Sequence, residues 1–297
     1  TEKVLNIGLR PHLTKWQAKY RRWYEEELKR DSGTPQDIQK KYPEYGALVE
    51  DLIETNEKMI EFKDVNFGYL QKDVLHNLSF TINKGETVGI IGGTGAGKST
   101  LVSLIGRNYD VRSGQIKIAG KNIQDYKLET LRQHISYVLQ NTSLISGTIK
   151  ENICMSKPYQ EETMNKALEV SQAKEFVSRL PQGIESAVVQ GGKNFSGGQR
   201  QRLTIARALY KQADILVLDD CSSALDYATD AALQKQLQEL KEMTKIVISQ
   251  RTASLKRCDR IMVLYHGELV GFDCHEELLK NCTVYKEIYE SQNSKDG

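Results

Sequence analysis

The stretch of sequence that decides the fold is Ile90-Ile91-Gly92-Gly93-Thr94-Gly95-Ala96-Gly97-Lys98-Ser99-Thr100. From Gly92 to Ser99 it has the spacing of a phosphate-binding loop, in which glycines let backbone N–H groups point at a polyphosphate. In such a loop, Lys98 reaches the β- and γ-phosphates and the Ser99 hydroxyl binds Mg²⁺. The stretch therefore predicts a nucleotide site at the N-terminus of a helix.

Apolar residues flank this loop on both sides. Residues 87–91 are typical of the buried strand that precedes such a loop, and residues 101–105 of the helix that follows it. The alternative, a glycine-rich turn with no ligand, does not explain why strand, lysine, serine and helix follow in this order. We therefore expect a nucleotide here.

Composition excludes several classes of protein. The chain has 297 residues, of which 27% are charged, and a formal net charge of +2, which gives no electrostatic reason to expect nucleic acid as a partner. Five cysteines without C-x-x-C spacing indicate neither a disulfide framework nor a zinc site. No signal peptide and no run of about 18 apolar residues is present, so we expect any membrane role to come through a partner or a further segment.

Alternating and apolar runs predict a set of strands along most of the chain. These runs cover residues 59–67, 74–82, 87–91, 115–120, 135–140, 215–218, 245–249, 260–265 and 268–270. Between residues 141 and 210 the pattern becomes helical, most clearly over 161–180. The sequence thus predicts an α/β core with an inserted helical lobe.

Residues 1–58 differ from the rest because aromatic and charged residues dominate and no strand-like run occurs. Apolar and aromatic residues at helical spacing, including Trp16, Tyr20, Trp23 and Tyr42, predict a small helical hairpin. We favour an appendage packed on its own aromatic residues or on the main domain. The alternative is a docking surface for a protein, a nucleic acid or lipid head groups.

Two further motifs narrow the class of nucleotide protein. Residues 194–202, Asn-Phe-Ser-Gly-Gly-Gln-Arg-Gln-Arg, and residues 215–220, Ile-Leu-Val-Leu-Asp-Asp, together resemble the signature and Walker B elements of the ABC ATPase family. The resemblance covers residues 59–292 and is strongest to exporter domains, which carry a stretch similar to residues 143–153. It implies a P-loop, RecA-like core with an antiparallel β subdomain and an inserted α-helical subdomain, in an ATP-binding domain spanning residues 59–297.

The resemblance also implies roles for single residues, with ATP and Mg²⁺ as the bound cofactors. Tyr69 matches the aromatic residue that stacks on adenine, although it could simply be a tyrosine at a strand end. Gln140 matches the glutamine that touches Mg²⁺ or the attacking water and senses the transmembrane partner. Asp219 matches the carboxylate that holds Mg²⁺, together with Ser99.

Other matched residues serve a neighbouring subunit in this family. The signature residues bind the ATP of the opposite subunit, so each site needs two chains; they are Phe195, Ser196, Gly197, Gly198 and Gln199. The loop that communicates between the two sites matches Ser223, Ala224, Leu225 and Asp226. Residues 189–192 match a short exporter loop that touches the membrane domain.

Two catalytic positions depart from the family pattern. Asp220 stands where the family has glutamate, and its carboxylate is one methylene shorter. Gln250 stands where the family has histidine, and its amide cannot exchange a proton near neutral pH. Because small displacements slow phosphoryl transfer strongly, we expect a site that binds ATP and hydrolyses it slowly.

These departures, combined with an intact signature, predict one slow site and one active site in a dimer with a non-identical ABC domain. The expected function is that of an ABC exporter subunit or domain: an ATPase, weak alone, at the cytoplasmic face of the membrane through a transmembrane partner. Two alternatives remain at this point. They are an ABC ATPase without a transporter, and a regulatory sensor that binds ATP without useful turnover.

Overall fold

The computed structural model describes residues 58–70, 72–140 and 143–293, and in the N-terminal segment Trp23, Tyr24, Glu27, Tyr42 and Pro43. The predicted helical appendage otherwise lies outside the described residues, as does the side chain of Ser222. The rings of Trp23 and Tyr42 pack with their centroids 5.1 Å apart, and Tyr42 is buried. The packing and the role of the segment stay predictions.

A six-stranded sheet forms the centre of the domain, in the order β12-β11-β3-β10-β9-β6. Neighbouring strands run parallel except β11 and β12. The strands are β3 (Thr87–Ile91), β6 (Ile135–Val138), β9 (Ile215–Asp219), β10 (Thr244–Ile248), β11 (Arg260–Tyr265) and β12 (Glu268–Asp273). Along β9, Ile215 and Val217 enter one core while Leu216 and Leu218 enter another. The apolar run is continuous because both faces of the sheet are covered.

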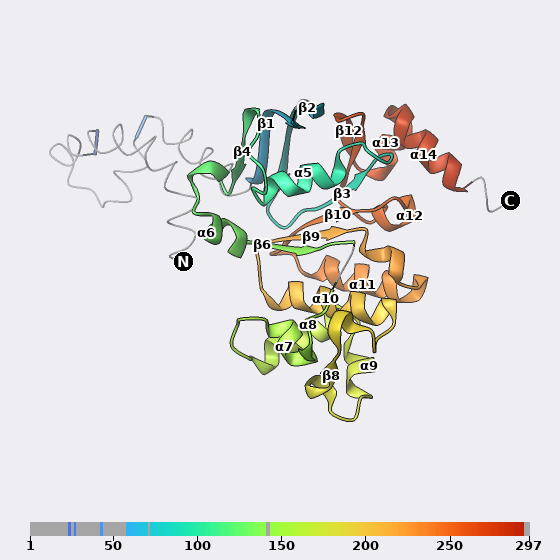
Figure 1. The fold of residues 1–297 in the computed structure, drawn as a ribbon. Coiled ribbons are helices and arrows are strands. Elements are labelled where there is room, and N and C mark those ends of the chain that lie inside the picture. The colour runs from blue at the N-terminus through green and yellow to red at the C-terminus, as the bar shows by residue number, and fades with distance from the viewer. Residues whose placement is uncertain are drawn as a thin grey trace.

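An antiparallel sheet covers one face, in the order β2-β1-β4-β5. Its strands are β1 (Lys58–Tyr69), β2 (Lys72–Asn83), β4 (Ser113–Ile118) and β5 (Lys121–Asn122). Helix α5 (Lys98–Ile105) lies between this sheet and the central one, and α6 (Leu128–Gln133) leads into β6 (Figure 1). This half contains the expected antiparallel β subdomain.

The helical lobe lies on the opposite side of the central sheet (Figure 1). It contains α7 (Ile149–Cys154), α8 (Glu161–Val170), α9 (Lys174–Ser178) and α10 (Gly197–Tyr210), with the short pair β7 (Gly147–Thr148) and β8 (Ala187–Val188). The predicted helical segment 161–180 is two helices, because α8 ends at Val170 and Gln172 takes a positive φ of 60°. A left-handed residue interrupts the helical backbone there.

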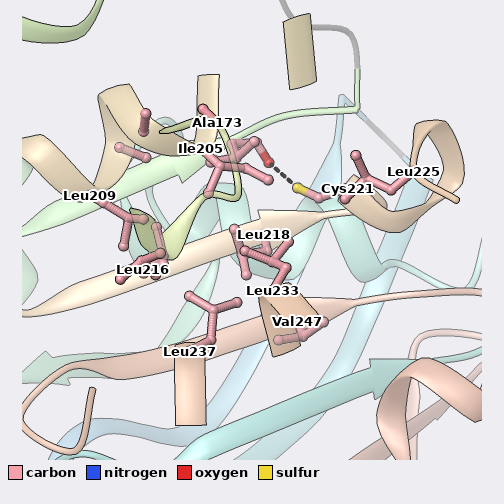
Figure 2. Close-up of a cluster of buried hydrophobic side chains, with 14 of the residues drawn as sticks. Ala173, Ile205, Leu209, Leu216, Leu218, Cys221, Leu225, Leu233, Leu237 and Val247 are labelled. Atoms are coloured by element: carbon pink, nitrogen blue, oxygen red, sulfur yellow. Dashed lines mark hydrogen bonds between the residues drawn. The ribbon is translucent and has the colours of Figure 1, made fainter. Parts of the chain in front are cut away.

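Helices α10 and α11 (Tyr227–Glu239) join the lobe to the sheet. Figure 2 shows Leu216 and Leu218 of β9 between Ile205 and Leu209 on α10 and Leu233 and Leu237 on α11. All six side chains are buried. This apolar cluster fixes where α10 begins relative to the end of β9.

The chain ends in three helices, α12 (Thr252–Leu255), α13 (His275–Asn281) and α14 (Thr283–Asn293). The sequence patterns predicted the nearby strands but not these helices, of which α12 is only four residues long. In the part of the chain that the structure describes, no helix combines the length and apolar character needed to cross a membrane.

Candidate nucleotide-binding site

The loop between β3 and α5 has the backbone shape that the glycines predict. Gly95 and Gly97 have positive φ values of 80° and 98°, and Gly97 caps the N-terminus of α5. A Cβ atom on Gly97 would lie 2.5 Å from Cδ2 of Leu75. Glycine is therefore required at Gly97 both by conformation and by the close approach of β2.

The ammonium group of Lys98 lies inside this loop. Its Nζ donates hydrogen bonds to the carbonyl oxygens of Gly92, at 2.7 Å, and Gly93, at 2.9 Å. Burial lowers the pKa of Lys98, while the negative charges of Asp219 and Asp220 raise it. The lysine is thus held at the mouth of the loop by carbonyls that a phosphate oxygen can replace as its partners.

Two adjacent carboxylates lie opposite the loop, at the end of β9. Oδ2 of Asp219 accepts a hydrogen bond from the Ser99 hydroxyl at 3.5 Å. Burial and the neighbouring charge of Asp220 raise the pKa of Asp219, and burial also raises that of Asp220. Positive charge brought to this point relieves the repulsion between the two carboxylates.

The carboxylate of Asp219 and the hydroxyl of Ser99 are suitable ligands for a Mg²⁺ ion that binds beside a nucleotide. The described residues contain no cluster of three or more His, Cys, Asp or Glu side chains suited to a metal ion. Mg²⁺ needs only one or two carboxylates when phosphate oxygens and waters complete its octahedron. Asp219 and the hydroxyl of Ser99 would hold the ion, and when bound it would neutralise charge on the phosphates.

The structure brings Gln140 to the same place. Its Nε2 donates to Oδ2 of Asp220 at 3.2 Å. The backbone of Asp220 has a positive φ of 49°, and its N–H donates to the carbonyl of Ile248 on β10 at 2.9 Å. Asp220 therefore turns out of β9 and its side chain meets Gln140, a contact that the sequence alone did not predict.

Gln250 follows β10, the strand that pairs with β9 in the central sheet. It lies two residues beyond the end of β10 and its side chain is exposed. The following residue, Arg251, lies close enough for its charge to lower the pKa of Asp220. The loop after β10 thus borders the carboxylate pair, as expected for parallel strands whose carboxyl ends share one edge.

Tyr69 ends β1 beside the N-terminus of α5. Its hydroxyl is 3.2 Å from Oγ1 of Thr100, and its ring meets that of Tyr109 edge-on, with centroids 5.2 Å apart. The Tyr69 side chain is 40% exposed. Tyr109 escaped the sequence analysis because no periodicity links it to Tyr69; only the turn after α5 brings the two rings together.

The signature residues begin helix α10. Ser196 and Gln199 cap it reciprocally: the amide of Gln199 donates to Oγ of Ser196, and the amide of Ser196 donates to Oε1 of Gln199. Phe195 is buried against Phe176. The first N–H groups of a helix have no partner within it, so the amides of Gly197 and Gly198 present donors to an anion.

Residues 221–226 connect the carboxylates to the signature. Oγ of Ser223 donates to the carbonyl of Asp220 at 2.9 Å, and the carbonyl oxygen of Ala224 lies 3.1 Å from where a Cβ on Gly198 would be. Leu225 is buried, and Asp226 caps α11 through the amide of Thr229. This loop therefore touches both Asp220 and the start of α10.

Comparison with known proteins places these features in one family. The ABC transporter family model matches residues 75–223. An ATP-dependent lipid A-core flippase of Haemophilus influenzae (strain 86-028NP) is 41% identical over 240 residues, which cover 79% of this chain and 41% of the flippase. An uncharacterized ABC transporter ATP-binding protein of Bacillus subtilis (strain 168) is 43% identical over 242 residues, covering 80% of this chain and 42% of that protein.

A solved structure gives the same result. A bacterial Atm1-family ABC exporter with ATP bound superimposes with a TM-score of 0.76 at 34% identity, covering 80% of this chain and 42% of that chain. The chain thus spans about two fifths of the length of the relatives it matches. The phosphate-binding loop, the carboxylates at the end of β9 and the signature helix all lie in the matched region, and this chain belongs to the ABC transporter family.

Proposed function

We propose that residues 59–297 form the ATP-binding domain of an ABC exporter. Its loop would bind the phosphates of ATP through Lys98 and backbone amides, with Mg²⁺ on Ser99 and Asp219 and with Gln140 beside the ion. Tyr69 would stack on adenine. A second ABC domain would complete the site, and closure of the two domains would drive a transmembrane partner.

One observation carries the two-chain part of this proposal. Lys98 opens α5 on one side of the central sheet, whereas Gly197 opens α10 on the other side, with the helical lobe (Figure 1). Ser196 and Gln199 form hydrogen bonds to each other, and Gly198 lies against the 221–226 loop. An anion at the start of α10 would therefore belong to a neighbouring chain.

Gly197→Glu tests this arrangement. A side chain has room at this position, where the nearest atom to an added Cβ is 4.0 Å away, and a carboxylate suits the first turn of a helix. The same carboxylate would repel a phosphate. We expect turnover of the chain assembled with its partner subunit to fall about a hundredfold, while ATP affinity of the chain alone changes less than twofold.

Gly197→Ala is the matched control, because it restricts the backbone equally without adding charge. The test is ATP hydrolysis by the assembled pair and equilibrium binding of a fluorescent ATP analogue to the chain alone. Equal losses of turnover in both variants, or a large loss of binding to the isolated chain, would contradict the two-chain site.

We further propose that this chain's own site is the slow one of a heterodimer. Asp220 has a short side chain, and Gln140 donates to its Oδ2. The exposed amide of Gln250 can donate to a γ-phosphate but cannot exchange a proton near neutral pH. The active site of the pair would then combine the partner's catalytic residues with this chain's Phe195, Ser196, Gly197, Gly198 and Gln199.

The surface near β6 supports a transmembrane partner. A cleft between β6 and the helical lobe is lined by Leu139 and Met155, and both side chains are more than half exposed. Residues 143–153 resemble an exporter stretch, and residues 189–192 resemble an exporter loop that touches the membrane domain. The two segments lie together, because the amide of Gly191 donates to the carbonyl of Leu144 at 3.0 Å. An apolar rim around a cleft suits a helix from another domain. Such docking would hold the domain at the cytoplasmic face of the membrane.

Leu139→Asp combined with Met155→Asp should weaken this docking at least tenfold, because the charges would be buried in the interface. The measurement is co-purification from detergent with the transmembrane domain, co-expressed as a separate polypeptide. Val270→Asp on β12, at the opposite edge of the central sheet, is the control. Undiminished retention of the double variant would contradict docking at this cleft, whereas no retention of the unaltered chain would favour an ABC ATPase without a transporter.

A further inference from the structure

The segment from Ser249 to Thr252, named here the switch loop, joins the end of β10 to α12. It carries Gln250, and the side chain of Gln292 on α14 forms hydrogen bonds to it on both sides of Arg251. Nε2 of Gln292 donates to the carbonyl of Gln250 at 2.7 Å. Oε1 of the same amide accepts from the N–H of Thr252 at 2.9 Å and from its hydroxyl at 3.0 Å.

These three hydrogen bonds fix the backbone on both sides of Arg251. Within the loop, the Arg251 amide also donates to Oγ of Ser249 at 3.0 Å. Ser249 and Thr252 are buried, whereas Gln250 is exposed. The backbone from which the exposed Gln250 side chain projects is thus tied to Gln292.

Helix α14 is itself well anchored along the face that carries Gln292. Tyr285 is fully buried, and its hydroxyl is 2.7 Å from Nδ1 of His275. Four residues later, the Tyr289 hydroxyl accepts from Nζ of Lys256, just after α12, at 3.2 Å. The helical spacing places Tyr285, Tyr289 and Gln292 on one face of α14, so the contacts of all three side chains are made by that face.

We propose that Gln292 is a positioning residue for the nucleotide site, acting from the C-terminal helix through the switch loop. It holds the loop so that residue 250 faces the phosphates, and it sets the distance from that residue to the carboxylate of Asp220. The two are linked through β10, since Ile248 accepts the Asp220 N–H two residues before Gln250. The inference rests on the proposed function of the site.

The expected effect follows from the geometry of phosphoryl transfer. The reaction depends on positioning, and a displacement of about 1 Å can lower a rate about a hundredfold. The phosphate contacts that dominate affinity come from the loop at residues 92–100, which Gln292 does not touch in the structure. Loss of Gln292 should therefore lower kcat and leave KM nearly unchanged.

The test uses the Asp220→Glu, Gln250→His chain, in which turnover is expected to be faster. Adding Gln292→Met keeps side-chain length and removes all three hydrogen bonds; we expect kcat to fall about tenfold with KM within twofold. Gln292→Glu keeps the acceptor for Thr252 and should lose less. Asn293→Ala is the matched control, because it removes a hydrogen bond to Tyr289 within the same helical turn.

Amide hydrogen exchange gives a second readout in the otherwise unaltered chain. Gln292→Met should raise the exchange rate of the Thr252 amide about tenfold, and Asn293→Ala should leave it unchanged. Equal effects of Gln292→Met and Asn293→Ala on kcat would overturn the inference, as would an unaltered kcat. If the Asp220→Glu, Gln250→His chain gains no turnover, the slow-site proposal fails. The hydrogen-exchange rate of the Thr252 amide then tests by itself whether Gln292 holds the switch loop.

Discussion

Replacing Asp220 with glutamate and Gln250 with histidine together should raise ATP turnover of the chain about a hundredfold. The longer carboxylate extends one methylene further from a backbone that is fixed by its hydrogen bond to Ile248. The imidazole restores a group that can carry a proton near neutral pH. Phosphate release at saturating MgATP measures the change.

Two companion variants separate the contributions to this gain. Asp220→Asn with Gln250→His keeps the imidazole but removes the carboxylate, and we expect no increase. Asp220→Glu with Gln250→Ala isolates the reach of the carboxylate and should give an intermediate rate. If the Asp220→Glu, Gln250→His chain binds ATP normally but shows no increase in turnover, the chain's own site is not slow for the reason proposed. A regulatory sensor of ATP would then be the better interpretation.

Replacing Lys98 with methionine should weaken MgATP binding by at least about a hundredfold, or about 2.7 kcal/mol. The ammonium group is partly buried inside the loop, where a charge-assisted contact to phosphate is stronger than in water. Methionine keeps much of the side-chain length, so that the loss reports the charge. Titration with a fluorescent ATP analogue measures the affinity.

Two measurements keep this result interpretable. Lys84→Met removes an exposed lysine that pairs with Glu242 at 3.5 Å, and it should leave ATP affinity unchanged. Because Nζ of Lys98 also donates to the carbonyls of Gly92 and Gly93, a denaturant titration checks that the loop variant remains folded. A folded Lys98→Met chain that binds MgATP as tightly as the parent would refute the assignment of the loop.

Much of the central sheet could be predicted because its strands are buried on both faces. Residues 215–218 and 245–249 are nearly continuous apolar runs, and the structure places residues 215–218 in β9 and residues 245–248 in β10. The phosphate-binding loop was equally predictable, since Gly97 must adopt a backbone angle that other residues avoid. Short helices such as α12 were missed because four residues carry no periodicity.

The sequence by itself determined the parts of the site that are contiguous: the loop around Lys98, the carboxylates at the end of β9 and the signature at the start of α10. Tertiary structure alone decided which distant residues meet. It placed Gln140 on Asp220, Tyr109 beside Tyr69, and Gln292 on the switch loop. A local motif is specified by the backbone conformations that neighbouring residues require. The distant contacts depend instead on how separate helices and strands pack around the sheet, and the spacing of residues in the sequence does not indicate that packing.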